Sequence, residues 1–449
     1  MSSITRDFTK GSIPKQLLEF SAPLFLASLL QIVYNMVDMI VVGQVIGEKG
    51  LSAVSVGGDV SNMLLFLGMG LSNAGQVIIS KYLGAQKKEL LGKFIATMFS
   101  FLAISAVVLS LVCGIFTNEF LILMNTPKEA FSEAYNYSII CIIGMVFIFG
   151  YNAVSATLRG LGDSRHPFVF IAIAALMNIA LDIIFVIFFN MGAGGAALAT
   201  VMSQCASFVI SVIFLYKKRH EIGFEIKTSD FLHIDKALLI ELLKLGLPMA
   251  IKSASIHFSK LFVNSFINSY GVAVSAFSGI ANKISSISNL LSNSLNTAGS
   301  SMVGQNIGAK TYKRIPKILL TISAATISLA IIMTGAIYLF PTQIFSIFTD
   351  KGSVLKIALE YLPVAALIFF GSALRAPANA IINGSGNYKV NFLTAILDGI
   401  VMRIGLSVVF GLLLNMKYFG FWLGDALAGF TPLFIGIVFY LKGSYKNEH

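Results

Sequence analysis

Charged residues are scarce in this sequence. Asp, Glu, Lys and Arg make up 12% of its 449 residues and hydrophobic residues 56%, whereas about 25% of a soluble globular protein is charged. Apolar stretches of about twenty residues, the length that a helix needs to cross the hydrocarbon core of a bilayer, recur along the whole chain. This composition excludes a soluble protein and predicts an all-α membrane protein whose main solvent is the lipid bilayer.

Catalytic and nucleotide-binding motifs are also lacking. The polar segments are too short for an ATPase domain, and neither a Ser-His-Asp arrangement nor metal-ligand spacing of His occurs. Gly68, Gly70 and Gly75 lie inside an apolar stretch, which favours close helix contact over phosphate binding. The three cysteines, Cys113, Cys141 and Cys205, all lie in apolar runs and do not have the even count of a disulfide framework. We therefore expect neither an enzyme nor a bound cofactor.

Charge clusters and turn residues divide the chain into twelve apolar segments. Lys and Arg concentrate in the segments that lie on one side of the membrane when the N-terminus is placed inside, as the positive-inside rule requires. The net charge of +11 then reflects topology and not nucleic-acid binding. We expect a multi-pass protein of the inner membrane with both termini in the cytoplasm. The predicted segments are 15–42, 52–80, 91–116, 132–158, 166–189, 193–216, 238–268, 275–305, 316–340, 355–382, 388–414 and 418–442.

The two halves of the chain resemble each other. Pro23 in SAPLFL corresponds to Pro248 in GLPMAI, Gly84 to Gly308, and LRGLGD to INGSGN, and each pair is 224 or 225 residues apart. Six segments separate equivalent points, so the halves share an orientation and are expected to be related by a pseudo-twofold axis along the membrane normal. We predict an N-lobe at 1–216, a cytoplasmic linker at 217–237 and a C-lobe at 238–449, with six helices in each lobe.

An ordered set of motifs resembles the multidrug and toxic compound extrusion (MATE) family. The set runs from FSAPLFLASLLQIVYNMVDMIVVG through YLGA to LRGLGD after the fourth segment and INGSGN after the tenth. The resemblance covers essentially the whole chain and implies two lobes around a central cavity, with alternating access. It also implies export of small amphiphilic, often cationic, organic compounds by antiport with H⁺ or Na⁺. We expect a monomer that acts on a small-molecule substrate.

Two acidic residues lie where the hydrocarbon core is expected. Asp38 in the first segment and Asp182 in the fifth fall at a similar depth in the outer half of the membrane, and Thr200 reaches the same level. Because a charge within a bilayer costs at least about 2.5 kcal/mol, such residues are candidates for function. Asn178 is four residues before Asp182 and shares its helix face. Carboxylate, amide and hydroxyl oxygens of this kind suit Na⁺ or a retained proton. The alternative is that both acids are structural.

Polar residues on the first and fourth segments extend this cluster. Gln31 and either Tyr34 or Asn35 share the face of Asp38 on the first helix. The cluster matches the acidic and polar N-lobe positions of the DinF-like branch of the family, where they are implicated in cation coupling. Asn152 resembles a further member of that cluster but lies deeper in our segment assignment. The resemblance therefore assigns cation coupling to Asp38, Asp182, Asn178, Thr200 and Asn152, with Na⁺ binding at the first four of these residues.

The second half carries basic residues instead. Lys252, His257 and Lys260 lie in the seventh segment and Arg375 in the tenth. The NorM-like branch has an acidic residue in its seventh helix, which MAIKSASIHFSK lacks, so a C-lobe Na⁺ site of that kind is not expected. Lys252 and Lys260 share a helix face and are candidates to contact anionic or zwitterionic substrates. Alternatively, they snorkel to the membrane surface or pair with Asp398 and Asp425.

Three alternatives to ion-coupled efflux of amphiphiles remain open. A lipid-linked precursor flippase of a related fold would use the cationic second half to hold a pyrophosphate. A dedicated exporter of an anionic or zwitterionic metabolite would use the same residues. A passive channel explains the sequence less well, because a channel does not need a pair of buried acids in one half of the chain only.

Overall fold

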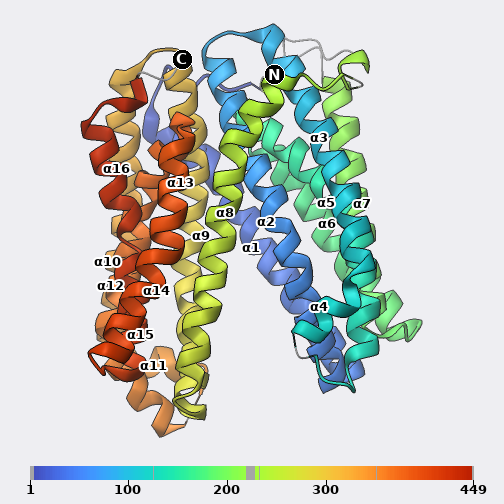
Figure 1. The fold of residues 1–449 in the computed structure, drawn as a ribbon, viewed down its shortest axis with the longest axis vertical. Helices are drawn as coiled ribbons and strands as arrows, with labels where there is room; N and C mark the ends of the chain where they lie inside the picture. Colours follow the sequence, from blue (N-terminus) through green and yellow to red (C-terminus); the bar gives the residue numbers. More distant parts are fainter. Residues whose placement is uncertain (1–4, 125, 219–227, 232, 350, 447–449) are drawn as a thin grey trace. The chain divides into compact units, whose positions relative to one another are not determined.

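The structure is a computed structural model that describes residues 5–124, 126–218, 228–231, 233–349 and 351–446. Within these residues the chain is helical and has no strand. Each of the twelve predicted apolar segments lies in a long helix or in a continuous run of helices, which confirms the all-α membrane fold (Figure 1). Most of the predicted linker, 219–227 and 232, falls outside the described residues.

The first half contains six long helical segments and one short helix. They are α1 (Ile13–Ile46), α2 (Glu48–Gly84), α3 (Lys88–Ile115), the short α4 (Thr117–Leu123), α5 (Phe131–Leu161), α6 (Arg165–Asp182) continued by the π-helix η1 (Ile183–Phe188), and α7 (Gly192–Lys218).

The second half repeats this order. After the 3₁₀ turn η2 (Thr228–Phe231) come α8 (Lys236–Asn268), α9 (Val272–Gly308), the 3₁₀ turn η3 (Tyr312–Arg314) with α10 (Ile315–Leu339), the short α11 (Pro341–Ser346) and α12 (Gly352–Ser385). The chain ends with the run α13 (Tyr388–Ile396), η4 (Leu397–Met402), α14 (Arg403–Val408) and η5 (Val409–Leu413), followed by α15 (Lys417–Ala428), α16 (Thr431–Leu441) and the turn η6 (Ser444–Lys446).

Hydropathy separates these helices into two groups. In the described part of the chain, nine helices or helical runs are long and apolar enough to cross a membrane. The remaining long helices, α2, α8 and α9, contain more Gly, Ser, Asn or Lys. On α9 many of the serines are buried, so this polarity faces other helices and not lipid. Large apolar side chains such as Leu111, Ile115 and Phe434 are exposed, as lipid contact requires.

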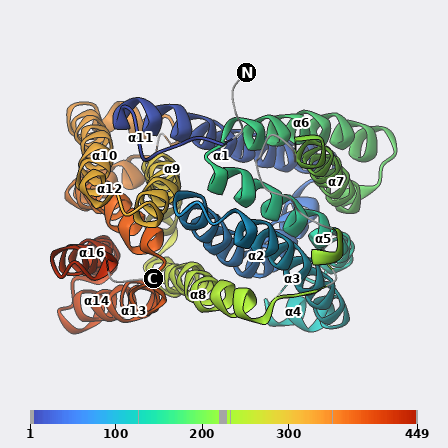
Figure 2. The same ribbon diagram turned by 90° about the horizontal axis from the view of Figure 1, so that it is seen from above.

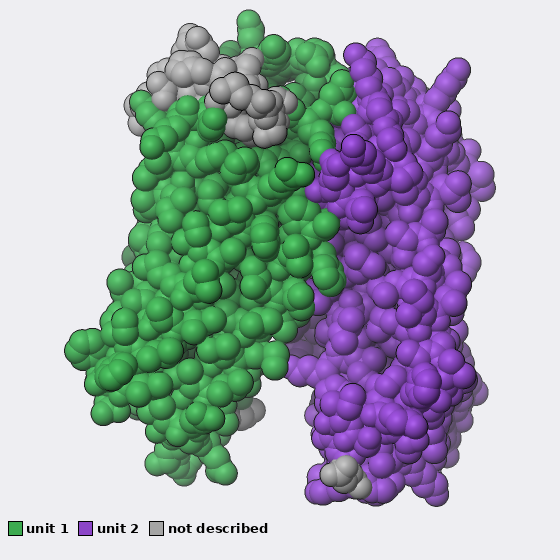
Figure 3. All heavy atoms as spheres, turned by 180° about the vertical axis from the view of Figure 1, so that it is seen from behind, with its two compact units in different colours: residues 1–7, 22–250 green, residues 8–21, 251–449 purple. Residues whose placement is uncertain are grey.

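The chain forms two compact units (Figure 3). The first unit comprises Met1–Asp7 and Ala22–Ala250, and the second comprises Phe8–Ser21 and Ile251–His449. The start of α1 thus belongs to the second unit and the start of α8 to the first. The predicted lobes at 1–216 and 238–449 differ from these units, because the start of α1 was predicted in the N-lobe and the start of α8 in the C-lobe. The division into lobes stays a prediction.

Helix packing follows the same pattern in both units. In the first unit α5 packs against α2, α3 and α7. In the second unit α12 packs in the same way against α9 and α10 (Figure 2). It also packs against the α15–α16 segment. The pair α6 and α7 likewise corresponds to α14 and α15. The internal repeat seen in the sequence is therefore also a repeat of structure.

Two glycines mark equivalent helix ends. Gly162 follows α5 with φ +95°, and Gly386 follows α12 with φ +76°. Both are left-handed, a conformation that costs glycine little because it has no Cβ. At Gly162 a Cβ would also lie 2.8 Å from the Arg6 side chain. LRGLGD and INGSGN therefore correspond because each motif ends its helix with a glycine in the left-handed conformation.

The second unit contains one extra helical residue after this point. From Gly162 to Asn190 is 28 residues and from Gly386 to Asn415 is 29, and the two asparagines end equivalent segments with φ 51° and 52°. The π-helix η5 corresponds in position to η1, whereas η4 has no counterpart in the first unit. A π-turn accommodates a one-residue insertion in a helix, so η4 accounts for the extra residue.

Candidate cation-binding site

Asp38 on α1, Asp182 at the end of α6, and Asn178 one turn earlier on α6 are buried in the first unit. The side chain of Thr200 on α7 lies between the helices: its Oγ1 is 3.4 Å from Asp38 Oδ2, and Asn178 Nδ2 is 3.4 Å from Thr200 Oγ1. The Asp38 and Asp182 carboxyl groups lie close enough to interact electrostatically. The structure thus brings four of the five predicted cation-coupling residues together.

Several oxygen atoms in this cluster have no donor. Among the described residues, Asp38 Oδ1, both carboxyl oxygens of Asp182 and Asn178 Oδ1 are buried and without a hydrogen-bond partner. Two neighbouring carboxylates in a low-dielectric site repel each other strongly unless a proton or a metal cation lies between them. Oxygen-only ligands are also those that hard cations such as Na⁺ prefer. The cluster therefore has the chemistry of a cation site.

Helix geometry explains why these side chains meet. Asn178 and Asp182 are one turn apart on the buried face of α6. Asp182 is the last α-helical residue before the π-helix η1. π-turns are frequently found at functional sites, because the extra residue re-aims neighbouring side chains.

Tyrosines and an amide surround the pair. Tyr34 is buried, receives a 3.5 Å contact from Gln31 Nε2, and lies near Gln204 and Asp38. Asn35 is exposed, so of the two predicted alternatives Tyr34 faces the cluster. Gln31 is itself exposed and reaches the cluster only through Tyr34.

Asn152 on α5 does not join this cluster. It is half-buried and makes no hydrogen bond to Asp38 or Asp182 within the described residues. Its place in the cation-coupling set rests on the resemblance alone.

Two residues near the site were not predicted. Gln204 is buried on α7 near Tyr34, and Tyr137 on α5 is buried near Asp38. Gln204 is one turn after Thr200, so helical spacing offered a signal for it. Tyr137 lies on a different helix, near polar residues at the start of α5, and its sequence offered no signal of contact with Asp38.

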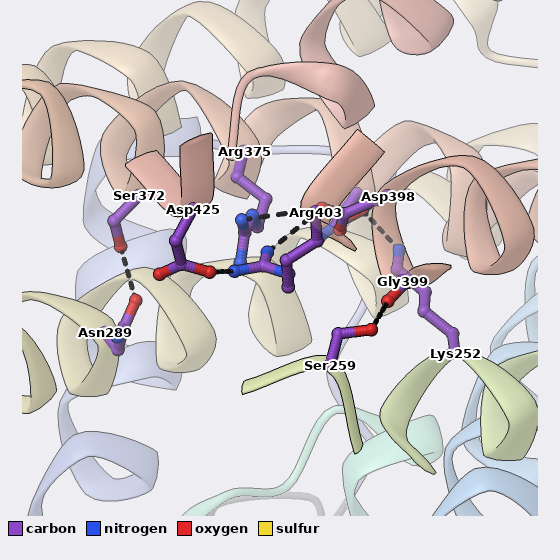
Figure 4. A network of polar contacts seen from close by, with 10 residues as sticks. Lys252, Ser259, Asn289, Ser372, Arg375, Asp398, Gly399, Arg403 and Asp425 are labelled. Atoms are coloured by element: carbon purple, nitrogen blue, oxygen red, sulfur yellow. Dashed lines mark hydrogen bonds and ion pairs between the residues drawn. The ribbon is translucent and has the colours of Figure 1, made fainter. Parts of the chain in front are cut away.

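Arg375 and Arg403 of the second unit form a separate network with Asp398 and Asp425 (Figure 4). Arg403 Nη2 lies 3.1 Å from Asp398 Oδ1, and the other terminal nitrogen of Arg403 donates to Asp425. Arg375 Nη2 lies 3.7 Å from Asp398. Lys252 Nζ donates to Asn379 Oδ1 at 2.6 Å. Asp398 and Asp425, the alternative partners predicted for Lys252 and Lys260, are thus held mainly by Arg403.

The remaining predicted residues of the second unit lie on α8. Lys260 is half-buried and lines a cavity together with Asp425. His257 is half-buried and interacts with other residues. The network centred on Arg403 was not predicted, because Asp398 and Arg403 are five residues apart. A spacing of five brings side chains together on a π-turn such as η4 and not on an α-helix.

Comparison with known proteins decides the family. A family model described as MatE matches residues 23–184 and 248–409, which is one match in each half of the chain and more than half of its length. The chain is a member of the MatE family. This confirms the resemblance to multidrug and toxic compound extrusion proteins. Assignment to the DinF-like branch stays a prediction.

Similar proteins cover the whole chain. The Bacillus subtilis proteins named probable multidrug resistance protein YoeA and YpnP are 29% and 30% identical, and each alignment covers 98% or more of this chain and 97% of the relative. A solved structure described as the outward-facing conformation of a multidrug resistance MATE family transporter is 21% identical, with a TM-score of 0.90, and covers 100% of this chain and 99% of that one. That likeness shows the fold.

Family membership settles the broad class. MatE proteins are multi-pass membrane transporters, which need no cofactor and are not enzymes. The cluster at Asp38 and Asp182 therefore lies in a transporter, and its role in cation coupling stays a prediction.

Proposed function

We propose that this MatE protein is a secondary active exporter of small amphiphilic organic compounds, driven by antiport of H⁺ or Na⁺. The relatives named as multidrug resistance proteins support the substrate class. The observation that carries the coupling is the set of buried, donor-free oxygens on Asp38, Asp182 and Asn178. We further propose that the protein is a monomer in the cell (inner) membrane with both termini in the cytoplasm.

Coupling requires that the ion and the substrate prefer different conformations of the transporter. In the proposed cycle the inward-facing protein takes up the compound. After the protein opens outward, a cation enters between Asp38 and Asp182 and favours release of the compound. The cation then leaves on the inner side. Thr200 and Asn178 supply oxygens to Na⁺ or hydrogen bonds that position the carboxyl groups around a proton.

The test uses purified full-length protein in liposomes loaded with a fluorescent amphiphilic cation. A pH gradient and a Na⁺ gradient are imposed separately, and dye movement is measured. We expect one gradient to accelerate movement against the dye's own gradient. Movement under neither gradient would contradict ion-coupled export and favour the lipid-linked precursor flippase.

A further inference from the structure

The membrane-spanning helices of the second unit hold more positive than negative charge. Away from the helix ends, the described buried or half-buried residues include four bases and two acids. Fully ionised, they give an excess of two positive charges in a region where charge is costly. These residues are Lys252, Lys260, Arg375, Arg403, Asp398 and Asp425.

The two carboxylates are already engaged by the two arginines. Asp398 contacts both Arg403 and Arg375, and Asp425 contacts Arg403. Lys252 donates to a neutral amide. The excess of two positive charges therefore falls on the two lysines. Lys260 makes no hydrogen bond or ion pair within the described residues, and the carboxylate with which it interacts electrostatically, Asp425, is already paired with Arg403.

A cavity of about 40 Å³ lies beside Lys260. It is large enough for a small ion, since a site for one water needs only about 10–15 Å³ by the same measure. Amide and hydroxyl groups line it, including those of Asn264, Asn282 and Ser285. The Asp425 carboxylate, which is paired with Arg403, and the Trp422 side chain line it too. The Lys260 ammonium group thus meets neutral polar groups and an already paired carboxylate at one cavity.

The internal repeat shows that this charge is specific to the second unit. With the 225-residue offset of the two family matches, Lys260 corresponds to Asn35 and Arg403 to Asn178. Asp38 and Asp182 correspond to the neutral residues Val263 and Ser407. At these equivalent positions the first unit thus has acids or amides where the second has neutral residues or bases.

We propose that the cavity beside Lys260 binds a monovalent anionic group, with Lys260 as its counter-charge and the amide groups of Asn264 and Asn282 as donors. The group is either chloride or the carboxylate of a transported molecule. A partly buried ammonium group without a hydrogen bond is destabilising, and a bound anion offsets this cost. The carboxylate version rests on the proposed export function and would extend its substrates to zwitterions. Binding of chloride does not depend on that function.

Trp422 provides a direct readout, because it is the single tryptophan of the chain. Iodide quenches tryptophan fluorescence on contact. Full-length protein in detergent is titrated with iodide at constant ionic strength, with methanesulfonate as the replaced anion. We expect saturable quenching of Trp422, relieved by chloride or acetate. Caesium, a cationic quencher, serves as the control for general access to the indole.

Two substitutions at Lys260 distinguish the effect of its charge on anion binding from the effect of its size. Lys260→Met is expected to raise the half-saturating iodide concentration about tenfold or more, since a hydrogen bond to a charged group contributes about 1.5–3 kcal/mol. Lys260→Arg keeps the charge and should retain saturable quenching. Quenching of the wild-type protein that rises without saturation, or saturation unchanged in Lys260→Met, would overturn the proposal.

A transport arm distinguishes the two anions. Liposomes are loaded with a rhodamine that carries a free carboxyl group or with its methyl ester. If the substrate carboxylate occupies the cavity, Lys260→Met slows export of the acid and not of the ester. If chloride occupies it, both dyes respond equally to removal of chloride. If the wild-type protein moves neither dye, the export function fails, while the fluorescence titration still tests the anion site.

Discussion

At the scale of single residues, the Thr200 hydroxyl tests the cation site most selectively. It lies between Asp38 and Asn178, and Thr200→Val removes it with little change in volume. Because a hydrogen bond contributes about 0.5–1.5 kcal/mol, we expect a two- to tenfold rise in the ion concentration for half-maximal transport. Thr157→Val is the matched control, since the buried Thr157 hydroxyl donates within its own helix. Equal ion dependence in both variants would argue against a role for Thr200.

Arg403 is expected to contribute strongly to the stability of the second unit. It is 1% exposed and bridges Asp398, which is fully buried, and Asp425. Arg403→Ala leaves a buried carboxylate without its main partner, which costs about 3–5 kcal/mol. We expect a clearly lower Tm in detergent, with Arg403→Lys intermediate because lysine lacks the planar fork. Lys283→Met, at an exposed position on α9, should leave the Tm unchanged. An Arg403→Ala protein as stable as the wild type would contradict this account.

At the scale of elements, the contact between α14 and α15 depends on a small residue. A Cβ on Gly424 would lie 2.4 Å from the backbone nitrogen of Ser407, whereas one on Gly405 would meet nothing within 4 Å. Gly424→Ala should therefore destabilise by about 1–3 kcal/mol through overpacking. Gly405→Ala should be neutral or stabilising by up to about 1 kcal/mol, because alanine favours helix. Thermal unfolding of the two variants measures the difference, and equal Tm values would refute close helix contact at Gly424.

The helices and their repeat could largely be predicted from the sequence, whereas some side-chain contacts between them could not. Twelve apolar segments, the repeat, and two acids at one depth follow from hydropathy, spacing and the cost of buried charge. Helical spacing alone did not choose between Tyr34 and Asn35, because both lie within one turn of Asp38. It also could not reveal the Asp398–Arg403 pair, since that contact depends on the π-turn η4. A one-residue insertion changes which side chains meet without leaving a hydropathy signal.

At the scale of the whole molecule, the distribution of Lys and Arg predicts which ends of the helices face the cytoplasm. Cysteine introduced at the exposed Lys351, before α12, should react with a membrane-impermeant maleimide in intact cells. Cysteine introduced at the exposed Lys313, before α10, should react only after the cells are permeabilised. Labelling is compared with that of the parent protein, whose cysteines are buried or half-buried. The reverse pattern would invert the proposed topology.

The whole exchange cycle depends on a cation held between two acids of the first unit. Export of dye by reconstituted Asp38→Asn and Asp182→Asn proteins, under the gradient that drives the wild type, measures this dependence. Glu89→Gln is the control, because Glu89 is an exposed acid on α3. We expect both aspartate variants to lose acceleration by the gradient while Glu89→Gln keeps it. Gradient-driven export by Asp182→Asn at the wild-type rate would contradict the proposed coupling.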